Sequence, residues 1–360
     1  MAVERACLYV DADRFFFSVE ALERPGLADD PRPVVISADP RVAPRAVVTT
    51  ANDAARKLGI TSALSAAIAL RRAPDAVFLP PRHELYAKHS ARLMALLRTE
   101  SPLVQQNSID EAALRWEHRG FDREPAVRLR RRVLDELGLS VSLGLAANPL
   151  VAKMASEAAK SVPDHVHVVP PGEEAAFLAP MPVRALIGVG PKAEARLRAL
   201  GIETIGVLAE RPLADLVEAF GQSYGRYLHR ASRGEDDSEL TDAREWKSIS
   251  AENTFGADTR DRVALWRELR SQAWEVARRL RGERLLAGEV AIKLRYANWE
   301  TITRQMRLGA PTDDAELIAA AAAALMRRHW DRARAIRLLG VRAGKLQPAG
   351  DAVQQALLEL

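Results

Sequence analysis

The sequence of 360 residues contains one cysteine, Cys7, and no cluster of cysteine and histidine residues. A single cysteine excludes an intramolecular disulfide and is typical of a protein in a reducing compartment. Long apolar runs are also absent, since the longest, residues 318–326, is too short to span a bilayer. Asp11 comes before any apolar segment long enough for a signal peptide. We therefore expect a cytoplasmic protein with no membrane partner.

The charge is close to balanced. The chain has 52 Lys and Arg against 48 Asp and Glu, and the net charge of +4 allows a polyanionic partner without requiring one. Hydrophobic residues make up 48% of the 360 residues, which is enough for two or more domains with buried cores. The sequence shows neither a low-complexity tail nor a convincing repeat.

Acidic residues follow the first apolar run and recur later in the chain. Asp11 and Asp13 come after residues 8–10, and Asp110 and Glu111 end a polar, β-prone stretch. Carboxylate oxygens are hard ligands that suit Mg²⁺ and Mn²⁺ rather than zinc. Two such ions about 4 Å apart catalyse in-line phosphoryl transfer when acidic side chains bridge them. Either motif alone is more typical of a solvated turn, but the bulky aromatic residues that follow Asp13 favour a functional site.

The hydrophobic pattern predicts alternating strands and helices in the first part of the chain. Asn148 and Pro149 open one helix, as an N-cap residue and a proline in the first turn. The predicted strands are residues 8–10, 33–37, 47–50, 76–79 and 141–145, and the other predicted helices are residues 53–58, 85–97 and 126–137.

The second half of the chain divides at an acidic stretch, residues 235–237, which is typical of a linker. The sequence before it, from residue 170, predicts short helices joined by short loops. A separate α+β unit follows between residues 247 and 346. After a first strand, its predicted elements are a helix at 260–280, strands at 289–296 and 301–308, a helix at 315–329 and a strand at 336–342.

Several motifs resemble those of the Y-family DNA polymerases, and most of all the DNA polymerase IV class. These are Asp-x-Asp-x-Phe-Phe-x-x-Val-Glu at residues 11–20 and Ser-x-Asp-Glu-Ala at residues 108–112. The resemblance covers nearly the whole chain. Further matching segments are residues 47–52, 55–59, 144–148, 152–156, 187–192, 247–250, 293–296 and 336–342.

The resemblance implies an α+β multidomain fold shaped as a right-hand polymerase. It also implies low-fidelity, template-directed synthesis across damaged DNA, with primer–template DNA and deoxynucleoside triphosphates as partners, and we expect a monomer. The implied domains are a palm (1–14 and 75–169), small fingers (15–74), a helical thumb with a helix-hairpin-helix (170–240), a little finger (245–346) and a tail (347–360).

The resemblance also implies roles for the acidic residues. Asp11, Asp110 and Glu111 would be catalytic and, with the backbone carbonyl of Ala12, would hold two Mg²⁺ ions, for which Mn²⁺ could substitute. In a regular strand Asp110 and Glu111 would point to opposite faces, so we expect a hairpin tip at this pair. The primer 3′-hydroxyl would then attack the α-phosphate and release pyrophosphate. For Asp13 we predict a different task, capping the helix that follows.

The nucleotide site is expected to involve aromatic, hydroxyl and basic side chains. Phe16 matches the position of the family's steric gate, where a ring occupies the space that a ribose 2′-hydroxyl needs. Phe15 lies beside it in the nucleotide-binding motif, although we favour core packing for its ring. Phe17 departs from the small residue usual in the family and either narrows the site or packs under the fingers. The residues matched to triphosphate binding are Thr50, Arg56 and Lys160, of which Lys160 lies two helical turns after Lys153.

Asp53 stands where the family usually has a tyrosine that binds the triphosphate. An aspartate there should repel phosphate, so two interpretations remain open. Asp53 either turns away and caps the helix of residues 54–58, which we favour, or weakens nucleotide binding.

DNA contacts are expected in the later domains. Residues 187–192 resemble a helix-hairpin-helix, whose glycine-rich turn lets backbone N–H groups approach a phosphate, although an ordinary helix–helix turn has a similar sequence. In the last domain, polar and basic residues alternate with apolar ones and predict sequence-independent phosphate contacts. The candidate DNA-binding residues are Gly188, Gly190, Lys192, Lys293, Arg295, Thr301, Thr303 and Arg307.

The C-terminal segment 355–360 resembles the peptide by which such polymerases bind the β sliding clamp. Gln355, Leu358 and Leu360 occupy the anchoring positions, and Ala356 replaces the usual leucine. A plain amphipathic tail would have a similar sequence. Two other functions remain open for the chain: a noncatalytic DNA- and clamp-binding adaptor of the same fold, and an unrelated palm-fold enzyme such as a nucleotide cyclase.

Overall fold

The computed structural model describes residues 6–117, 120–243 and 245–350. The chain forms two compact units, one from residues 1–42 and 46–243 and the other from residues 43–45 and 244–360. Among the described residues, no helix has the length and apolar character needed to cross a membrane.

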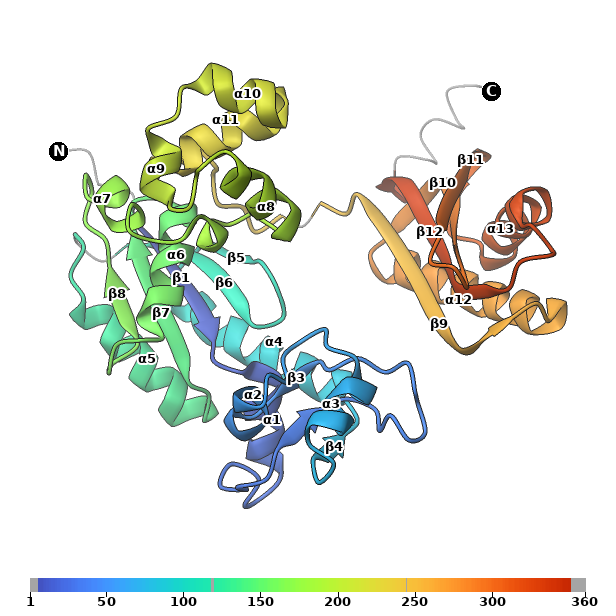
Figure 1. Cartoon of the computed structure of the whole chain (residues 1–360), viewed down its shortest axis with the longest axis horizontal. Helices are drawn as coiled ribbons and strands as arrows, with labels where there is room; N and C mark the ends of the chain where they lie inside the picture. Colours follow the sequence, from blue (N-terminus) through green and yellow to red (C-terminus); the bar gives the residue numbers. More distant parts are fainter. Residues whose placement is uncertain (1–5, 118–119, 244, 351–360) are drawn as a thin grey trace. The chain divides into compact units, whose positions relative to one another are not determined.

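The first unit is built around a five-stranded sheet with the order β5-β6-β1-β7-β8 (Figure 1). The central strand β1 pairs antiparallel with both β6 and β7, whereas β7 and β8 are parallel. The predicted strands at 8–10 and 141–145 are confirmed as the cores of β1 and β7. The strands are β1 (Ala6–Ala12), β5 (Val104–Gln106), β6 (Glu111–Trp116), β7 (Val141–Ala146) and β8 (Val166–Val168).

Alternate residues of β1 enter two different cores. Leu8 and Val10 pack with three helices on one face, whereas Cys7 and Tyr9 pack with α6 and the small helices that follow it. The second face is therefore the one on which a functional residue of β1, such as Asp11, meets α6. The helices are α1 (Phe15–Glu23), α4 (His83–Glu100) and α5 (Glu124–Leu137) on the first face, and α6 (Pro149–Ala159) on the second.

Helix α6 lies unusually close to the sheet because β7 contains Gly144. A Cβ atom at this position would be 2.0 Å from the carbonyl oxygen of Ala152, so no larger residue fits without separating the helix from the strand. Asn148 caps the helix by accepting a hydrogen bond from the N–H of Val151, and Pro149 occupies the first turn, as predicted. This close packing brings Lys153 of α6, and Lys160 at its C-terminal end, to the acidic end of the sheet.

Two smaller parts complete the first unit. A three-stranded sheet, β3-β2-β4, carries two short helices, and a group of short helices packs on the α6 face of the large sheet. The first part contains β2 (Val34–Ile36), β3 (Thr50–Ala51), α2 (Asp53–Lys57), α3 (Ala66–Arg72) and β4 (Val77–Leu79). The second contains α7 (Glu174–Leu178), η1 (Val183–Ala185), α8 (Pro191–Ala199), α9 (Ile205–Ala209), α10 (Leu213–Phe220) and α11 (Gln222–Ala231).

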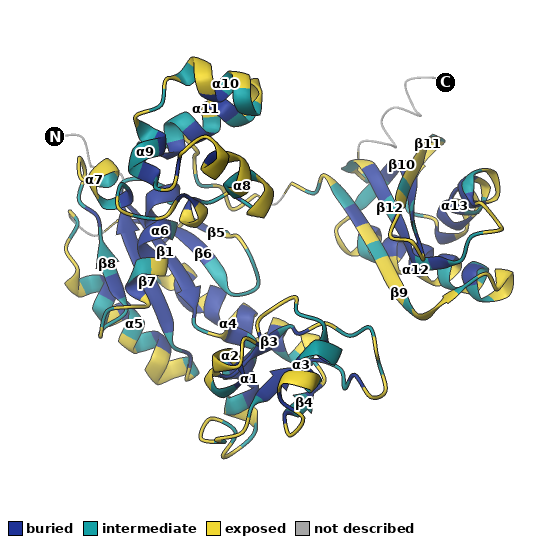
Figure 2. Ribbon diagram, in the orientation of Figure 1, coloured by how far each residue is buried: buried dark blue, intermediate teal, exposed yellow. Residues whose placement is uncertain are grey.

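The second unit is an antiparallel sheet with the order β11-β10-β12-β9, and two helices cover one of its faces. Figure 2 shows β10 and β12 largely buried and the outer strands β9 and β11 largely exposed. The predicted helix at 315–329 has the bounds of α13, and the predicted strands extend further at their ends. The elements are β9 (Ser248–Thr259), α12 (Arg262–Gly282), β10 (Leu285–Tyr296), β11 (Thr301–Thr312), α13 (Ala315–His329) and β12 (Ile336–Pro348).

Candidate active site

A tight turn between β5 and β6 places the acidic pair beside the end of β1. Asp11 lies directly opposite Glu111 in the β1–β6 register, and the N–H of Ala12 donates a 3.0 Å hydrogen bond to the carbonyl of Asp110. The hairpin expected at the pair is therefore present. The expectation that the pair ends a β-stretch is wrong, because Asp110 lies in the turn and Glu111 begins β6.

Glu111 is held by two donors that share one of its oxygens. The hydroxyl of Tyr9 donates to Oε2 over 2.8 Å, and the ammonium of Lys153 lies 2.8 Å from the same atom. The amide of Asn107 donates in turn to the Tyr9 hydroxyl over 3.2 Å. Burial raises the pKa of Tyr9 to about 12, so this phenol stays protonated and remains a donor. Glu111 thus has a fixed position without any ligand.

Asp11 is held by Lys160, the residue that directly follows α6. Its carboxylate is 6% exposed and lies 3.0 Å from the ammonium of Lys160, which also lies 2.7 Å from Glu157. Burial raises the pKa of Asp11 to about 7, Lys160 opposes that shift, and the charges of Glu157 and Glu111 add to it. The end of β1 therefore carries buried negative charge that one lysine compensates incompletely.

The donor set of this edge fits a magnesium or manganese ion. Asp11, Asp110 and Glu111 offer carboxylate oxygens and Ala12 a backbone carbonyl, which are the ligands that these hard cations prefer. A cation would stabilise the ionised form of Asp11, whose pKa is raised mainly by burial and further by the charges of Glu157 and Glu111. In the described residues the side chains are not gathered into a ready cage of three or more ligands, and the Asp110 carboxylate accepts a 2.5 Å hydrogen bond from Ser108. Ion loading would require these ion pairs and this hydrogen bond to rearrange.

Asp13 does not cap the helix that follows it, so that prediction is wrong. Its carboxylate accepts hydrogen bonds of 2.7 Å from the hydroxyls of Ser140 and Ser142, and it lies 3.2 Å from His165. The cap position of α1 is Arg14, without a side-chain cap bond. The β1–β7 pairing places the serine hydroxyls within reach of Asp13, and these contacts between distant parts of the sequence replace the local cap.

The three consecutive phenylalanines have different surroundings. Phe15 and Phe17 are 2% and 8% exposed and belong to the main core, which agrees with core packing for Phe15 and shows that the Phe17 ring is also packed in the core. The Phe15 ring is therefore not open to a nucleotide in this structure. Phe16 is half-buried, with its ring centroid 4.9 Å from that of Tyr86. Of the three rings, only that of Phe16 has a partly open face.

The candidate triphosphate residues lie in two places. The guanidinium of Arg56 donates to the hydroxyl of Thr50 over 3.1 Å and to the carbonyl of Ala51 over 2.9 Å. Lys160 is instead bound to Asp11 at the end of β1. The structure thus brings Thr50 and Arg56 together and places Lys160 with the acidic residues.

Asp53 is not the cap of α2, so the favoured interpretation is wrong. The cap is Asn52, one residue earlier, whose side chain accepts hydrogen bonds from the N–H groups of Ala55 and Val34. The carboxylate of Asp53 lies 2.5 Å from the guanidinium of Arg14, and both side chains are about half-exposed or more, at 65% and 44%. The negative charge of Asp53 therefore has a cation beside it.

The glycine-rich turn lies between η1 and α8. Gly188 has φ of +84°, a left-handed conformation that favours glycine, and Tyr224 donates a 2.9 Å hydrogen bond to its carbonyl. Gly190 is the cap residue of α8, and a Cβ atom there would meet no atom within 4 Å. Lys192 is exposed on the first turn of α8. These features leave the start of α8 open to a phosphate.

The candidate DNA-binding residues of the second unit share one face of its sheet. In the β10–β11 register Lys293 lies opposite Thr303, Arg295 opposite Thr301, and Glu289 opposite Arg307. The alternating residues Ile292, Leu294 and Tyr296 are buried, as the pattern predicts. The face is less basic than expected, since Lys293 pairs with Glu252 at 2.8 Å and Glu289 with Arg342 at 3.3 Å.

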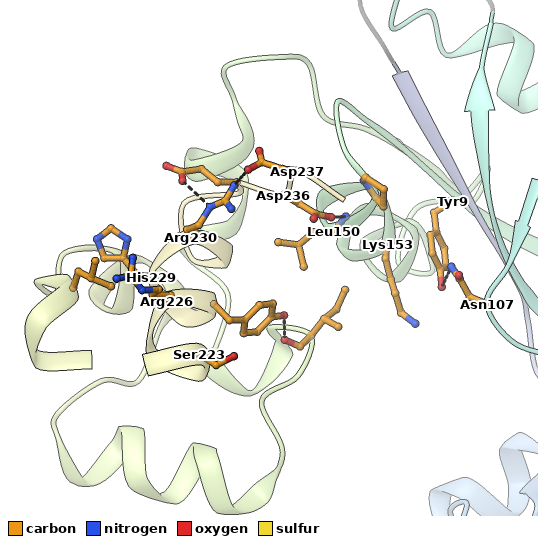
Figure 3. Close-up of a pocket in the computed structure, with 15 residues that line it drawn as sticks. Tyr9, Asn107, Leu150, Lys153, Ser223, Arg226, His229, Arg230, Asp236 and Asp237 are labelled. Atoms are coloured by element: carbon orange, nitrogen blue, oxygen red, sulfur yellow. Dashed lines mark hydrogen bonds and ion pairs between the residues drawn. The ribbon is translucent and has the colours of Figure 1, made fainter. Parts of the chain in front are cut away.

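A cavity of about 760 Å³ lies between α6 and the helices that follow it (Figure 3). Tyr9, Asn107 and Lys153 line one side, Ser223 and Arg226 line the other, and Tyr227 is a further lining residue. The hydroxyl of Tyr227 donates to the carbonyl of Ile187 beside the glycine-rich turn. The cavity thus connects the residues that hold Glu111 with the candidate phosphate-binding turn.

Three residues of this site, Tyr9, Asn107 and Arg14, were not identified from the sequence. Tyr9 had a detectable signal, because it lies two positions before Asp11 and so on the same face of β1. Asn107 and Arg14 act through partners that are distant in sequence, so the sequence carried no detectable signal for either residue. The clamp-binding candidates Gln355, Leu358 and Leu360 lie outside the described residues.

Comparison with known proteins gives three matching family models that together cover most of the chain. Residues 10–157 match the impB/mucB/samB family, residues 184–236 match the thumb domain of DNA polymerase-iota, and residues 246–357 match the C-terminal domain of the impB/mucB/samB family.

Relatives in sequence span almost the same length. DNA polymerase IV of Halorhodospira halophila is 40% identical, with 96% of each chain covered. DNA polymerase IV of Methanoculleus marisnigri is 38% identical, over 99% of this chain and 98% of that protein. A solved chimera of the Y-family polymerases Dbh and Dpo4 has a TM-score of 0.82 at 24% identity, covering 95% of this chain and 99% of that one.

Dbh DNA polymerase in an insertion ternary complex has a TM-score of 0.67 at 23% identity, with 95% and 99% coverage. These structures show the fold, which consists of palm, fingers, helical thumb and α+β little finger. Relatives of 38–40% identity along nearly the whole length show the family. The chain therefore belongs to the DNA polymerase IV family, the DNA-directed DNA polymerases of translesion synthesis.

Proposed function

We propose that this chain extends primers with deoxynucleotides through a magnesium site formed by Asp11, Ala12, Asp110 and Glu111. The observation that carries the proposal is the β1–β6 register, which sets Asp11 opposite Glu111 and ties Ala12 to Asp110. When bound, Mg²⁺ or Mn²⁺ would lower the pKa of the primer hydroxyl and neutralise charge on the α-phosphate. The protein's own contribution is to position these oxygens.

Each remaining residue has a task that its surroundings support. Glu111, fixed by Tyr9 and Lys153, would face the primer 3′-hydroxyl. Lys160 would exchange its bond with Asp11 for a triphosphate oxygen, since an ammonium is a point-charge donor to phosphate. Arg56 and Thr50 already lie together. Arg56 would donate to the triphosphate through its planar guanidinium group and Thr50 through its hydroxyl.

Selection and DNA binding use other residues. Phe16 would reject ribonucleotides, because its partly open ring would clash with a 2′-hydroxyl. The open start of α8, with Gly188, Gly190 and Lys192, would bind a backbone phosphate through its free N–H groups. The exposed face of the second unit would add contacts to phosphates without reading the sequence, through Lys293, Arg295, Thr301, Thr303 and Arg307.

Primer extension by the amide variants Asp11→Asn, Asp110→Asn and Glu111→Gln tests the catalytic site. Each should lower kcat by at least about a hundredfold, since an amide keeps the size of the side chain and removes its charge. Asp135→Asn, at an exposed carboxylate of α5, is the matched control and should retain full activity. A wild-type chain that binds primer–template and gives no product with Mg²⁺ would instead indicate the noncatalytic adaptor.

The C-terminal peptide is proposed to bind the β sliding clamp through Gln355, Leu358 and Leu360. Deleting residues 355–360 should abolish stimulation by the clamp while basal extension stays the same. Gln354→Ala, just before the anchoring positions, is the control and should leave stimulation intact. Equal stimulation of the deleted and full chains would end this part of the proposal.

A further inference from the structure

The turn between β10 and β11 presents a tryptophan to solvent. Residues 297–300 form this turn, and Trp299 at its tip is 62% exposed. It is the most exposed aromatic ring among the large apolar residues of the described chain, and Trp274 on α12 follows at 49%. Such exposure of an indole ring removes little apolar surface from water, so folding alone gives no reason for tryptophan here.

The backbone of the turn makes this choice of residue more unusual. Trp299 has φ of +68°, a left-handed conformation in which bulky residues are outliers and glycine is favoured. The turn is held by hydrogen bonds from the N–H of Trp299 to the carbonyl of Tyr296 and from the N–H of Tyr296 to the carbonyl of Glu300. Arg334 donates to Asn298 over 2.9 Å and to Glu300 over 2.7 Å. A strained aromatic residue in a turn fixed this firmly points to a function for the ring.

Two guanidinium groups lie close to the ring. Arg337 lies with its Cζ 4.1 Å from the ring centroid, and that of Arg295 is 5.7 Å away. Two carboxylates lie nearby, since Glu300 pairs with the arginine that holds the turn and Asp258 lies 3.9 Å from Arg337. Asp258 also pairs with Arg45 at 2.7 Å, and the charge of Asp331 acts on Arg334. The cluster thus has four guanidinium groups against three carboxylates and a positive balance beside an exposed ring.

We propose that Trp299 is a stacking platform for an unpaired base of single-stranded DNA, with Arg295 and Arg337 attracting the adjoining phosphates. A nucleotide offers both a flat π face and a negative charge, which are the two features that an exposed indole and a net positive cluster recognise. An apolar protein segment would match the ring but would not balance the net positive charge of the cluster. Because every base has a π face, the platform binds without preference for sequence.

A fluorescent oligonucleotide tests the platform without catalysis. The full chain is titrated with a single-stranded oligo-dT that contains one 2-aminopurine, in the absence of primer, nucleotide and metal. Stacking on indole quenches 2-aminopurine, so the wild-type chain should quench it on binding. Trp299→Gly should lose the quenching and bind about tenfold more weakly, whereas Trp299→Phe should retain most of both.

Two controls separate this effect from a loss of structure. Trp299→Gly should melt at or above the temperature of the wild type, because glycine is the residue that φ of +68° favours. Trp274→Ala, which removes the other exposed indole, should leave binding and quenching unchanged.

Three outcomes would overturn the inference. One is wild-type quenching and affinity in Trp299→Gly, and another is an equal loss in Trp299→Phe and Trp299→Gly. The third is a Trp299→Gly chain that keeps its affinity for the oligonucleotide but loses direct binding to the sliding clamp, measured without metal or nucleotide, which would assign the surface to a protein partner. Since the assay contains no metal or nucleotide, none of these results depends on the proposed catalytic site.

Discussion

Tyr9 donates a 2.8 Å hydrogen bond to Oε2 of Glu111 from the strand position two residues before Asp11. The phenol is buried, and its raised pKa of about 12 keeps the proton on the donor at any working pH. Tyr9 and Asp11 lie on one face of β1, so the strand that supplies one carboxylate also positions the other. Tyr9 is in this sense a positioning residue for the candidate metal site.

Tyr9→Phe should therefore lower the rate of extension without changing the fold. A hydrogen bond to a charged group contributes about 1.5 kcal/mol, so we expect kcat to fall about tenfold while KM for nucleotide stays within about twofold. Steady-state primer extension measures both, and Mn²⁺ titration of the protein alone reports the affinity of the metal site. Tyr86→Phe is the matched control, because its hydroxyl donates to the structural carboxylate of Glu20 over 2.7 Å. Equal losses of kcat in the two variants would contradict the positioning role.

The Arg14–Asp53 ion pair predicts a coupled effect on nucleotide binding. Exposed pairs of this kind contribute at most about 1 kcal/mol, so changes in KM of about threefold are expected. Asp53→Asn releases Arg14 and removes a negative charge, and should lower KM for nucleotides. Arg14→Ala leaves Asp53 without its cation and should raise KM. Steady-state kinetics of both variants and of the double variant give the coupling free energy between Arg14 and Asp53 in nucleotide binding. Strictly additive effects on KM would show that the pair does not act as a unit.

The sequence predicted those elements that periodicity and local signals define. The helix at 315–329 has apolar residues on one face and Asp314 as its cap. Helix α6 has Asn148 as its cap and Pro149 in its first turn. In both cases the local sequence marks where the helix begins. The acidic pair was recognised as a hairpin tip because two adjacent side chains could not otherwise serve one centre. The hairpin predicted from this motif is confirmed by the turn between β5 and β6.

The errors lie where a contact between distant residues competes with a local one. Asp13 has the residue type of a helix cap, but β1–β7 pairing sets it beside Ser140 and Ser142, more than a hundred positions away. At α2 the capping residue is Asn52 instead of Asp53, an error of one position at a helix boundary. Such contacts depend on tertiary packing, which a single sequence does not display.

Lys153→Met should strengthen binding of divalent cations. The ammonium of Lys153 lies 2.8 Å from Glu111, so it competes for the oxygen that an ion would take. Without it, Mg²⁺ should stabilise the protein at lower concentration, by about threefold to tenfold, in thermal unfolding. Lys192→Met, on the first turn of α8, is the control in the absence of DNA. An unchanged Mg²⁺ dependence in Lys153→Met would show that the lysine does not compete.

Phe16→Ala should relax discrimination against ribonucleotides. Removing the ring opens the space that a 2′-hydroxyl needs, and the ratio of kcat/KM for deoxy- over ribonucleotides should fall by at least about a hundredfold. Phe17→Leu is the control, because Phe17 is buried in the core and its loss should affect stability rather than selection. An unchanged ratio in Phe16→Ala would place the gate elsewhere.

The last prediction concerns a buried carboxylate that serves the fold alone. The side chain of Glu20 is fully buried, accepts hydrogen bonds from Arg82 and Tyr86, and pairs with Arg24 at 3.1 Å. Burial raises the pKa of Glu20, but the hydrogen bonds and the arginine charges outweigh it and lower the pKa below the ordinary 4.5. The ionised form therefore stabilises the folded state at neutral pH.

Glu20→Gln should reduce the free energy of unfolding by about 2 kcal/mol at pH 7, since both arginines lose their counter-charge. A lowered pKa means that this contribution is present above the unfolded value and is lost as the pH falls through the folded one. The difference between wild type and variant should thus stay constant down to about pH 5 and then shrink. Urea unfolding at several pH values measures it, with Glu124→Gln, an exposed partner of Arg128, as the control. A difference that persists unchanged at pH 3 would show that the charge of Glu20 is not what stabilises the fold.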